Sequence, residues 1–262
     1  MVRAMSDSYG AIRLSIDDRI AKLVIERPPV NAIDDVLIEN LNKSLDRIES
    51  QKSLSVLHIK SGIGVFSAGA DIDLMRNCLG TPAGRDNMVS IVRELQRVFA
   101  RIEELSVVSI AEIGGAAMGG GLELALACDL RVAAEQAKLG LPEASLGLLP
   151  AAGGTQRLPR ICGEAVARRL ILGAEVVGGG EAHRLGLVHW VVAAEELATW
   201  SDGLAARLGS MPAEALAACK RCIAAAADDS VDGYDLELTE TRRLHDTAET
   251  RRRVESMLVK SG

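Results

Sequence analysis

The sequence predicts an α/β fold with parallel strands, followed by a helical region at the carboxyl end. Up to about residue 195, short apolar strand patterns alternate with longer segments whose apolar residues recur at helical spacing. Beyond that point the strand pattern disappears, and Ala, Leu, Arg and Glu dominate. We therefore expect a core over residues 1–195 and a helical region over residues 196–262, packed as one unit because no linker sequence separates them.

The first elements are a strand pair and a helix. AIRLSID at 11–17 and IAKLVIE at 20–26 flank a turn at Asp17 and Asp18 and predict a β-hairpin, which RPPVNAI at 27–33 ends. From residue 34 to residue 49 the apolar residues recur at helical spacing, and Asp34 or Asp35 is suited to cap the start of that helix.

Strands and helices then alternate. Strands are expected at 54–60, 107–113, 130–135 and 187–192, and helices at 86–105 and 163–174. Because neighbouring parallel strands need long crossover connections, the intervening helices predict parallel pairing.

Composition excludes several classes of function. Thirty Lys and Arg against 36 Asp and Glu give a net charge of −6, so no global field attracts nucleic acid or anionic lipid. No apolar signal segment and no apolar stretch of about 18 residues are present, which predicts a cytoplasmic protein with no membrane partner. The five cysteines are scattered, and the C-x-x-C of Cys219 and Cys222 has only two of the four ligands that a zinc site needs. Reduced thiols and no metal are expected.

Three glycine-rich segments stand out, FSAGADI at 66–72, MGGGLEL at 118–124 and LPAAGGTQRL at 149–158. None is a P-loop or a dinucleotide-binding fingerprint. Gly119, Gly120 and Gly121 follow a predicted strand and open an apolar helix, whose first N–H groups lack intrahelical partners and suit an oxyanion. A second N–H from the turn in SAGAD would complete a two-donor hole. Close packing is the alternative explanation for these glycines.

Two glutamates are candidates for acid–base chemistry. Glu123 is the one charged residue in IGGAAMGGGLELALAC at 113–128, and burying a carboxylate without a partner is costly. Glu143 follows in LGLPEASLGLLP. Two close, partly buried carboxylates share a proton, so that one can give while the other takes. The alternatives are a buried ion pair with an Arg for Glu123 and a cap after Pro142 for Glu143, and spacing alone does not decide between them.

Taken in order, FSAGADI, GGAAMGGGLELALACDLRVA and LGLPEASLGLLPAAGGTQRLPR resemble the crotonase (enoyl-CoA hydratase/isomerase) superfamily. ERPPVNAI upstream and GEAHRLGLVHWVV downstream extend the resemblance over nearly the whole chain. The resemblance implies a ββα-superhelix spiral core with a C-terminal helical region that builds trimers, often stacked as hexamers.

The resemblance also implies roles for individual residues. Ala70 and Gly120 match the two oxyanion-hole donors. Glu123 and Glu143 match the catalytic glutamates of hydratases, and we assign Glu123 as the base that activates water and Glu143 as the acid that protonates C2. The remaining matches are to substrate and CoA contacts, which are Ala68, Asp71, Ile72, Asp73 and Ala151.

The implied reaction is syn addition of water across the 2,3 double bond of a trans-2-enoyl-CoA, with CoA carried by the substrate and no cofactor. The chain departs from the pattern in three places. Ala151 stands where hydratases commonly have Gly, which affects the acyl pocket, and Thr250 and Val254 replace the usual Gly and aromatic of the tail.

Three alternatives remain. A Δ3-Δ2-enoyl-CoA isomerase needs one glutamate and no water, and other acyl-CoA lyases share the fold. An RNA-binding or scaffold role would use Arg93, Arg97 and Arg101, which follow one another at four-residue spacing. Glutamates at 94, 103 and 104 dilute that stripe, so no nucleic-acid partner is expected.

Overall fold

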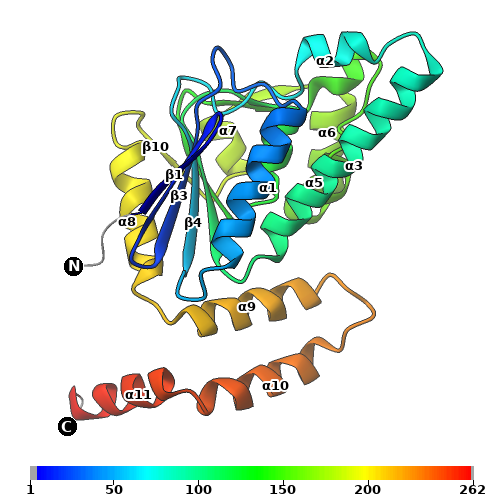
Figure 1. Ribbon diagram of the computed structural model, residues 1–262. Helices are drawn as coiled ribbons and strands as arrows, with labels where there is room; N and C mark the ends of the chain where they lie inside the picture. The colour runs from blue at the N-terminus through cyan, green and yellow to red at the C-terminus, as the bar shows by residue number, and fades with distance from the viewer. Residues whose placement is uncertain (1–4, 261–262) are drawn as a thin grey trace.

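The computed structural model describes residues 5–260 and contains a central seven-stranded sheet in the order β1-β2-β3-β4-β5-β7-β10 (Figure 1). The first three strands are antiparallel, and each later neighbour pair from β3 to β10 is parallel. The mixed sheet thus confirms the predicted hairpin and the predicted parallel strands. The strands are β1 Met5–Tyr9, β2 Ile12–Asp17, β3 Ile20–Ile25, β4 Val56–Ser61, β5 Val108–Ile113, β7 Leu130–Ala134 and β10 Trp190–Val192.

A second, three-stranded sheet lies next to the glycine-rich segments. It consists of β6 Ala117–Met118, β8 Lys138–Gly140 and β9 Val176–Gly178. β6 pairs in parallel with β8, which places Met118 opposite Gly140. The pairing therefore brings the segment before Gly120 beside the segment before Glu143.

Helices cover the sheet as the periodicity predicts (Figure 1). α1 Asp35–Glu49 begins at Asp34, whose carboxylate accepts from Leu37 N–H, so Asp34 is the cap. α3 Pro82–Glu104 begins four residues before the predicted helix, because Thr81 caps it and Pro82 is a favoured first residue. The other helices of this part are α2 Ile72–Asn77, α4 Gly120–Leu126, the 3₁₀-helix η1 Pro142–Leu146, α5 Gly154–Cys162, α6 Glu164–Leu172 and α7 Gly179–Arg184.

The core joins the faces of the sheet to the helices above it. Its largest fully buried side chains include Phe66, Phe99, Leu23, Leu41 and Ile59. All three segments of the first crossover, β3, α1 and β4, contribute to this set or to the surrounding cluster. Burial of each such side chain contributes a stabilising free energy on the order of 1.5–3 kcal/mol, and this packing fixes the strand ends that carry the loops of the site.

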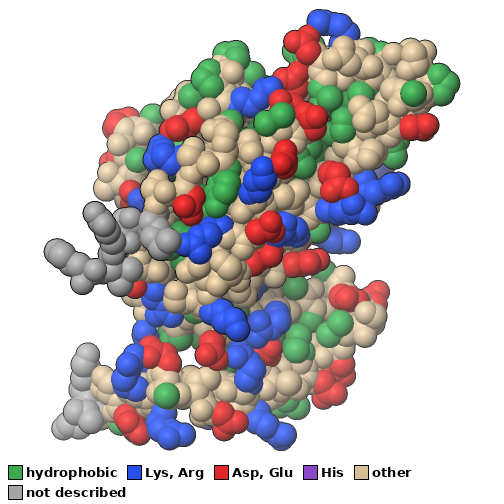
Figure 2. All heavy atoms as spheres, in the orientation of Figure 1, with side chains coloured by type: hydrophobic (Ala, Val, Ile, Leu, Met, Phe, Trp, Pro, Cys, Tyr) green, Lys and Arg blue, Asp and Glu red, His purple; other side chains and the backbone are tan. Residues whose placement is uncertain are grey.

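The region after residue 195 is helical, as predicted. α8 Leu197–Gly209 packs against the central sheet, and α9 Ala213–Ala225 lies under the body. α10 Gly233–His245 and α11 Ala248–Lys260 form the lowest layer in Figure 1. Figure 2 shows side chains of both charge signs interspersed over this layer. Within residues 5–260, no helix is long and apolar enough to cross a membrane.

Several apolar side chains of α9–α11 stand in solvent in the single chain. They are Ile223, Tyr234, Leu238, Val254, Met257 and Leu258. The side chain with the largest exposed fraction among them is Tyr234, at 83%. An exposed apolar set of this size is typical of an association surface.

Candidate active site

Two loops that are distant in sequence meet at the edge of the second sheet. Ser67 forms an isolated parallel bridge with Ala117, and its carbonyl accepts the Met118 N–H at 2.9 Å. A Cβ on Gly69 would lie 2.8 Å from the Met118 carbonyl oxygen and 3.2 Å from the Gly120 nitrogen. Gly69 also has a φ of +89°, which favours glycine. Only a residue without a side chain therefore permits this approach.

The approach brings the amides of Ala70 and Gly120 close together. A Cβ on Gly120 would lie 4.0 Å from the Ala70 nitrogen. Neither of these two N–H groups donates a hydrogen bond within the part of the chain that the structure describes, although their neighbours do. Two free amide donors from separate loops can together hold an oxygen that carries negative charge.

Glu123 lies in the first turn of α4 and is only 3% exposed. The Gly154 N–H donates to its Oε1 at 2.7 Å. The pKa of Glu123 is raised to about 7, chiefly by burial and also by the charge of Glu143. The amides of Gly154 and Ala152 and the charge of Arg157 oppose this effect. Glu123 is therefore a carboxyl that exchanges its proton near neutral pH.

Glu143 lies in the first turn of η1 and is half-buried. Its Oε1 lies 2.7 Å from the position that a Cβ on Gly119 would occupy, and Gly119 has a φ of +51°. Its Oε2 is buried and has no hydrogen-bond partner among residues 5–260. Burial raises the pKa of this carboxyl as well. The second glutamate thus sits directly beside the loop that carries the Gly120 amide.

Neither glutamate forms an ion pair with a described residue. Arg157, the basic group that acts electrostatically on Glu123, pairs instead with Glu103 at 2.8 Å. The charge of Glu143 acts on Glu123, so the two carboxyls lie within electrostatic range of each other. The geometry gives one buried and one half-buried carboxyl, neither in an ion pair, next to two free amide donors. This constellation is suited to moving protons around a polarised carbonyl.

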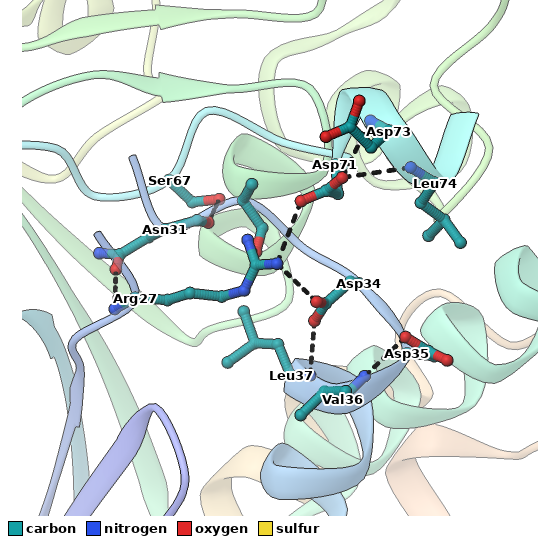
Figure 3. Close-up of polar contacts among 11 residues, drawn as sticks. Arg27, Asn31, Asp34, Asp35, Val36, Leu37, Ser67, Asp71, Asp73 and Leu74 are labelled. Atoms are coloured by element: carbon teal, nitrogen blue, oxygen red, sulfur yellow. Dashed lines mark hydrogen bonds and ion pairs between the residues drawn. The ribbon is translucent and has the colours of Figure 1, made fainter. Parts of the chain in front are cut away.

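The residues predicted to contact CoA lie in the same loops, and Figure 3 shows two of them, Asp71 and Asp73. Ala68, Ile72 and Asp73 are exposed. Asp71 caps α2 by accepting from the Asp73 and Leu74 N–H groups, and it also accepts from Arg27 at 3.1 Å. The Asp71 carboxylate is therefore occupied within the protein. Ala151 is half-buried, and its carbonyl accepts from Gln96 Nε2 at 2.6 Å.

The structure also brings in groups that the sequence analysis did not single out. Gly154 and Ala152 supply amides to Glu123, and Arg157 Nη1 donates to the Ala152 carbonyl at 3.1 Å. Gly154 belongs to one of the three glycine-rich segments, so the sequence pattern did point to the region in which it lies. Arg27 and Asn31, in contrast, belong to loop 27–33. The periodicity there indicates only the end of a strand, and the resemblance matches this segment to one beside the CoA without giving either residue a role.

The arginines considered for nucleic-acid binding are partly committed within the protein. Arg101 bonds to Asp46 and Glu49, and Arg97 pairs with Glu94. Within the described residues, no group of three or more His, Cys, Asp and Glu side chains is placed to hold a metal ion, and all five cysteines are free thiols.

Comparison with known proteins places this geometry in a family. Residues 15–259 match the family model described as enoyl-CoA hydratase/isomerase. A probable enoyl-CoA hydratase of Bacillus subtilis is 44% identical over 179 residues, which is 68% of each chain. A crotonyl-CoA hydratase of Syntrophomonas wolfei is 38% identical over 203 residues, which cover 77% of this chain and 76% of that one.

Among solved structures, an enoyl-CoA hydratase from Geobacillus kaustophilus superposes with a TM-score of 0.93 at 28% sequence identity, over 98% of this chain and 97% of that one. The superposition spans the C-terminal helices as well as the core, which confirms the crotonase-type α/β fold with its helical carboxyl region. The chain therefore belongs to the enoyl-CoA hydratase/isomerase family.

Proposed function

We propose that the protein is an enoyl-CoA hydratase, which adds water in the syn sense across the 2,3 double bond of a trans-2-enoyl-CoA. The observation that supports this most directly is the pair of glutamates at 123, which is buried, and 143, which is half-buried. Both have a raised pKa and neither has an ion-pair partner in the described chain. A hydratase needs two carboxyls because one takes the proton of water while the other protonates carbon.

In the proposed reaction, the thioester oxygen is held by the N–H groups of Ala70 and Gly120. Negative charge grows on this oxygen as water attacks C3, so the two donors stabilise the transition state more than the substrate. Glu123 takes a proton from the attacking water, whose oxygen bonds to C3. Glu143 gives its proton to C2 as the carbonyl reforms. One water molecule is consumed, and the two carboxyls exchange protons with solvent to return to the starting state.

The substrate is proposed to be a CoA thioester, with Ala68, Asp71, Ile72 and Asp73 beside its thioester and adenine ends. The exposed apolar side chains of Leu146 and Leu149, which follow Glu143 in sequence, favour an apolar acyl group. The methyl group of Ala151 narrows the acyl side relative to a glycine. The chemistry uses only carboxyls, amides and water, so no cofactor or metal is required.

The alternative within the family is a Δ3-Δ2-enoyl-CoA isomerase, which moves a double bond with one carboxyl. The presence of a second carboxyl with a raised pKa favours hydration, because isomerisation leaves that group without a task. Other acyl-CoA lyases on this fold use the same oxyanion hole and differ in the acyl group.

The test is hydration of crotonyl-CoA, followed by the loss of absorbance of the conjugated enoyl thioester. Glu123→Gln and Glu143→Gln are each expected to lower kcat at least about 100-fold. Glu195→Gln, at an exposed position without a hydrogen bond or ion pair in the described chain, is the matched control and retains full turnover. If Glu123→Gln stays fully active and a 3-enoyl-CoA is rapidly conjugated, the isomerase assignment replaces the hydratase.

A further inference from the structure

We propose that Arg27 is a positioning residue for the oxyanion hole, because it ties the loop that carries the Ala70 amide to the start of α1. The catalytic part of this inference rests on the proposed hydratase function. The structural part, which concerns how the loop is held, is independent of the reaction.

Arg27 joins two helix caps through one atom. Its Nη2 donates to Asp34 Oδ2 at 2.6 Å and to Asp71 Oδ2 at 3.1 Å (Figure 3). Asp34 caps α1 by accepting from Leu37 N–H, and Asp71 caps α2 by accepting from Asp73 and Leu74 N–H. A single guanidinium nitrogen thus connects the first turns of two helices whose first residues are 37 positions apart in sequence.

The rest of Arg27 holds its own loop. Its Nη1 donates to the Ala32 carbonyl at 3.1 Å, and its backbone N–H donates to Asn31 Oδ1 at 2.7 Å. Asn31 is fully buried, and its side-chain amide donates to the carbonyls of Val65 and Phe66. The loop before α1 and the segment leading into the Ala70 turn are therefore connected at both ends.

Between these two connections lies the Ala70 amide. Ile33 and Ala70 form an isolated parallel bridge, in which Ile33 N–H donates to the Gly69 carbonyl at 2.8 Å and Asp71 N–H donates to the Ile33 carbonyl at 2.9 Å. These bonds use the groups on either side of the Ala70 N–H and leave that N–H free. The direction of this donor is consequently set by the bridge. We call the two contacts of Arg27 Nη2 with Asp34 and Asp71 the Arg27 clamp, and this clamp holds the bridge at the Asp71 side.

Electrostatics makes the clamp more than a passive contact. Asp34 and Asp71 have side chains that are only 15% and 21% exposed, and both carboxylates approach the same nitrogen. Without the guanidinium, two partly buried carboxylates face each other at short range and repel. Hydrogen bonds from the Leu74 and Asp73 amides lower the pKa of Asp71 and remain when Arg27 is removed, so protonation does not neutralise this carboxylate at neutral pH. Removal of Arg27 is therefore expected to drive α2 and the Ala70 turn away from α1.

The chain offers a closely matched control. Arg101 is 27% exposed in its side chain against 28% for Arg27, and its Nη2 also contacts two carboxylates, those of Asp46 and Glu49. These two acids lie near the other end of α1, away from the Ala70 turn. A comparison of Arg27→Met with Arg101→Met separates the loss of any two-carboxylate arginine from the loss of this clamp.

The experiment has a catalytic and a structural arm. In the catalytic arm, Arg27→Met is expected to lower kcat for crotonyl-CoA at least about tenfold, with a smaller change in KM, because a misplaced donor weakens the transition state more than the bound substrate. The absorbance of a bound cinnamoyl-type CoA thioester, which shifts to longer wavelength when its carbonyl is polarised, is expected to shift less than in the wild type. Arg27→Lys restores part of both signals, and Arg101→Met changes neither.

In the structural arm, hydrogen exchange of the Ile33 and Asp71 amides is measured by NMR on the full chain. Arg27→Met is expected to speed exchange at these two amides at least about tenfold, whereas Arg101→Met leaves them at the wild-type rate. Equal exchange in Arg27→Met and wild type, or an equal increase in Arg101→Met, overturns the clamp. If the wild type does not hydrate enoyl-CoA at all, the proposed function falls, and the exchange rates still decide whether Arg27 holds the turn.

Discussion

The Gly154 N–H donates a hydrogen bond of 2.7 Å to Oε1 of Glu123, and a Cβ on Gly154 would lie 3.0 Å from that same oxygen. The loop that makes this contact is held from α3 and α5, because Gln96 bonds the Ala151 carbonyl and Arg157 bonds the Ala152 carbonyl. A carboxyl buried in α4 is thus supported by backbone from a separate loop, and this arrangement underlies the first three predictions.

The pH dependence of turnover should report the pKa of Glu123. As the proposed base, Glu123 must be ionised, and its pKa is about 7 because of burial. We expect log kcat/KM for crotonyl-CoA to fall with a slope near one below about pH 7. A profile that stays flat from pH 5 to pH 8, measured in constant ionic strength, contradicts this role.

Substitution of Arg157 should move that limb of the profile. The Arg157 charge lowers the pKa of Glu123, so Arg157→Met is expected to raise this pKa and shift the limb to higher pH. Arg160→Met, at an exposed position on the same helix, is the control and should leave the limb in place. A shift to lower pH in Arg157→Met is incompatible with the electrostatic argument.

Stability should depend on pH through the same carboxyl. The folded protein retains the Glu123 proton up to about pH 7, whereas the unfolded chain releases it near 4.5. The unfolded state therefore binds fewer protons in this window, and the free energy of unfolding falls as pH rises from 4.5 through 7. Glu123→Gln lacks this loss, so urea unfolding should show the variant gaining up to about 3 kcal/mol relative to the wild type across the window. An unchanged difference at both ends of the window rules the linkage out.

Gly119 should be intolerant of any side chain. A Cβ there would lie 2.7 Å from Glu143 Oε1, so Gly119→Ala is expected to displace this carboxyl and lower kcat at least about 100-fold. Gly163→Ala is the control, since Gly163 also has a positive φ, +81°, but no atom within 4 Å of its Cβ position. Both substitutions introduce backbone strain. When kcat is compared at the same fraction of folded protein, only Gly119→Ala should lose turnover.

The oligomeric state is open to a direct measurement. The exposed Tyr234, Leu238 and Ile223 favour association through the C-terminal helices, and we expect sedimentation at three or six times the 27.7 kDa chain mass. Tyr234→Glu and Leu238→Glu together should shift the distribution toward the single chain. Sedimentation of the wild type as a single chain at micromolar concentration contradicts the predicted homotrimer or dimer of trimers.

The sequence predicted six strands of the central sheet and the long helices, because their apolar periodicity is strong. It missed β1 and the short strands β6, β8 and β9 of the second sheet, which have only two to five residues each. It missed α2 and placed the start of α3 late, since the segment between them has few buried residues and its helix starts depend on the caps Asp71 and Thr81. The two glutamates and the two glycine-rich loops stood out by residue type, but only the family resemblance assigned them to one site. The Gly154 contact and the Arg27 clamp were not predicted, because both join segments far apart in the chain, and such contacts leave no local pattern.

The close fit of Gly69 against Gly120 has a consequence for how this enzyme can diversify. The part of the site that would activate the carbonyl consists of main-chain atoms, whose placement requires the absence of side chains at these points. The exposed Leu146 and Leu149 lie outside this contact and can therefore be exchanged without disturbing the amides. Under the proposed function, selection of the acyl group and activation of the thioester are separable, so libraries that vary these two positions should change substrate preference while the chemical step persists.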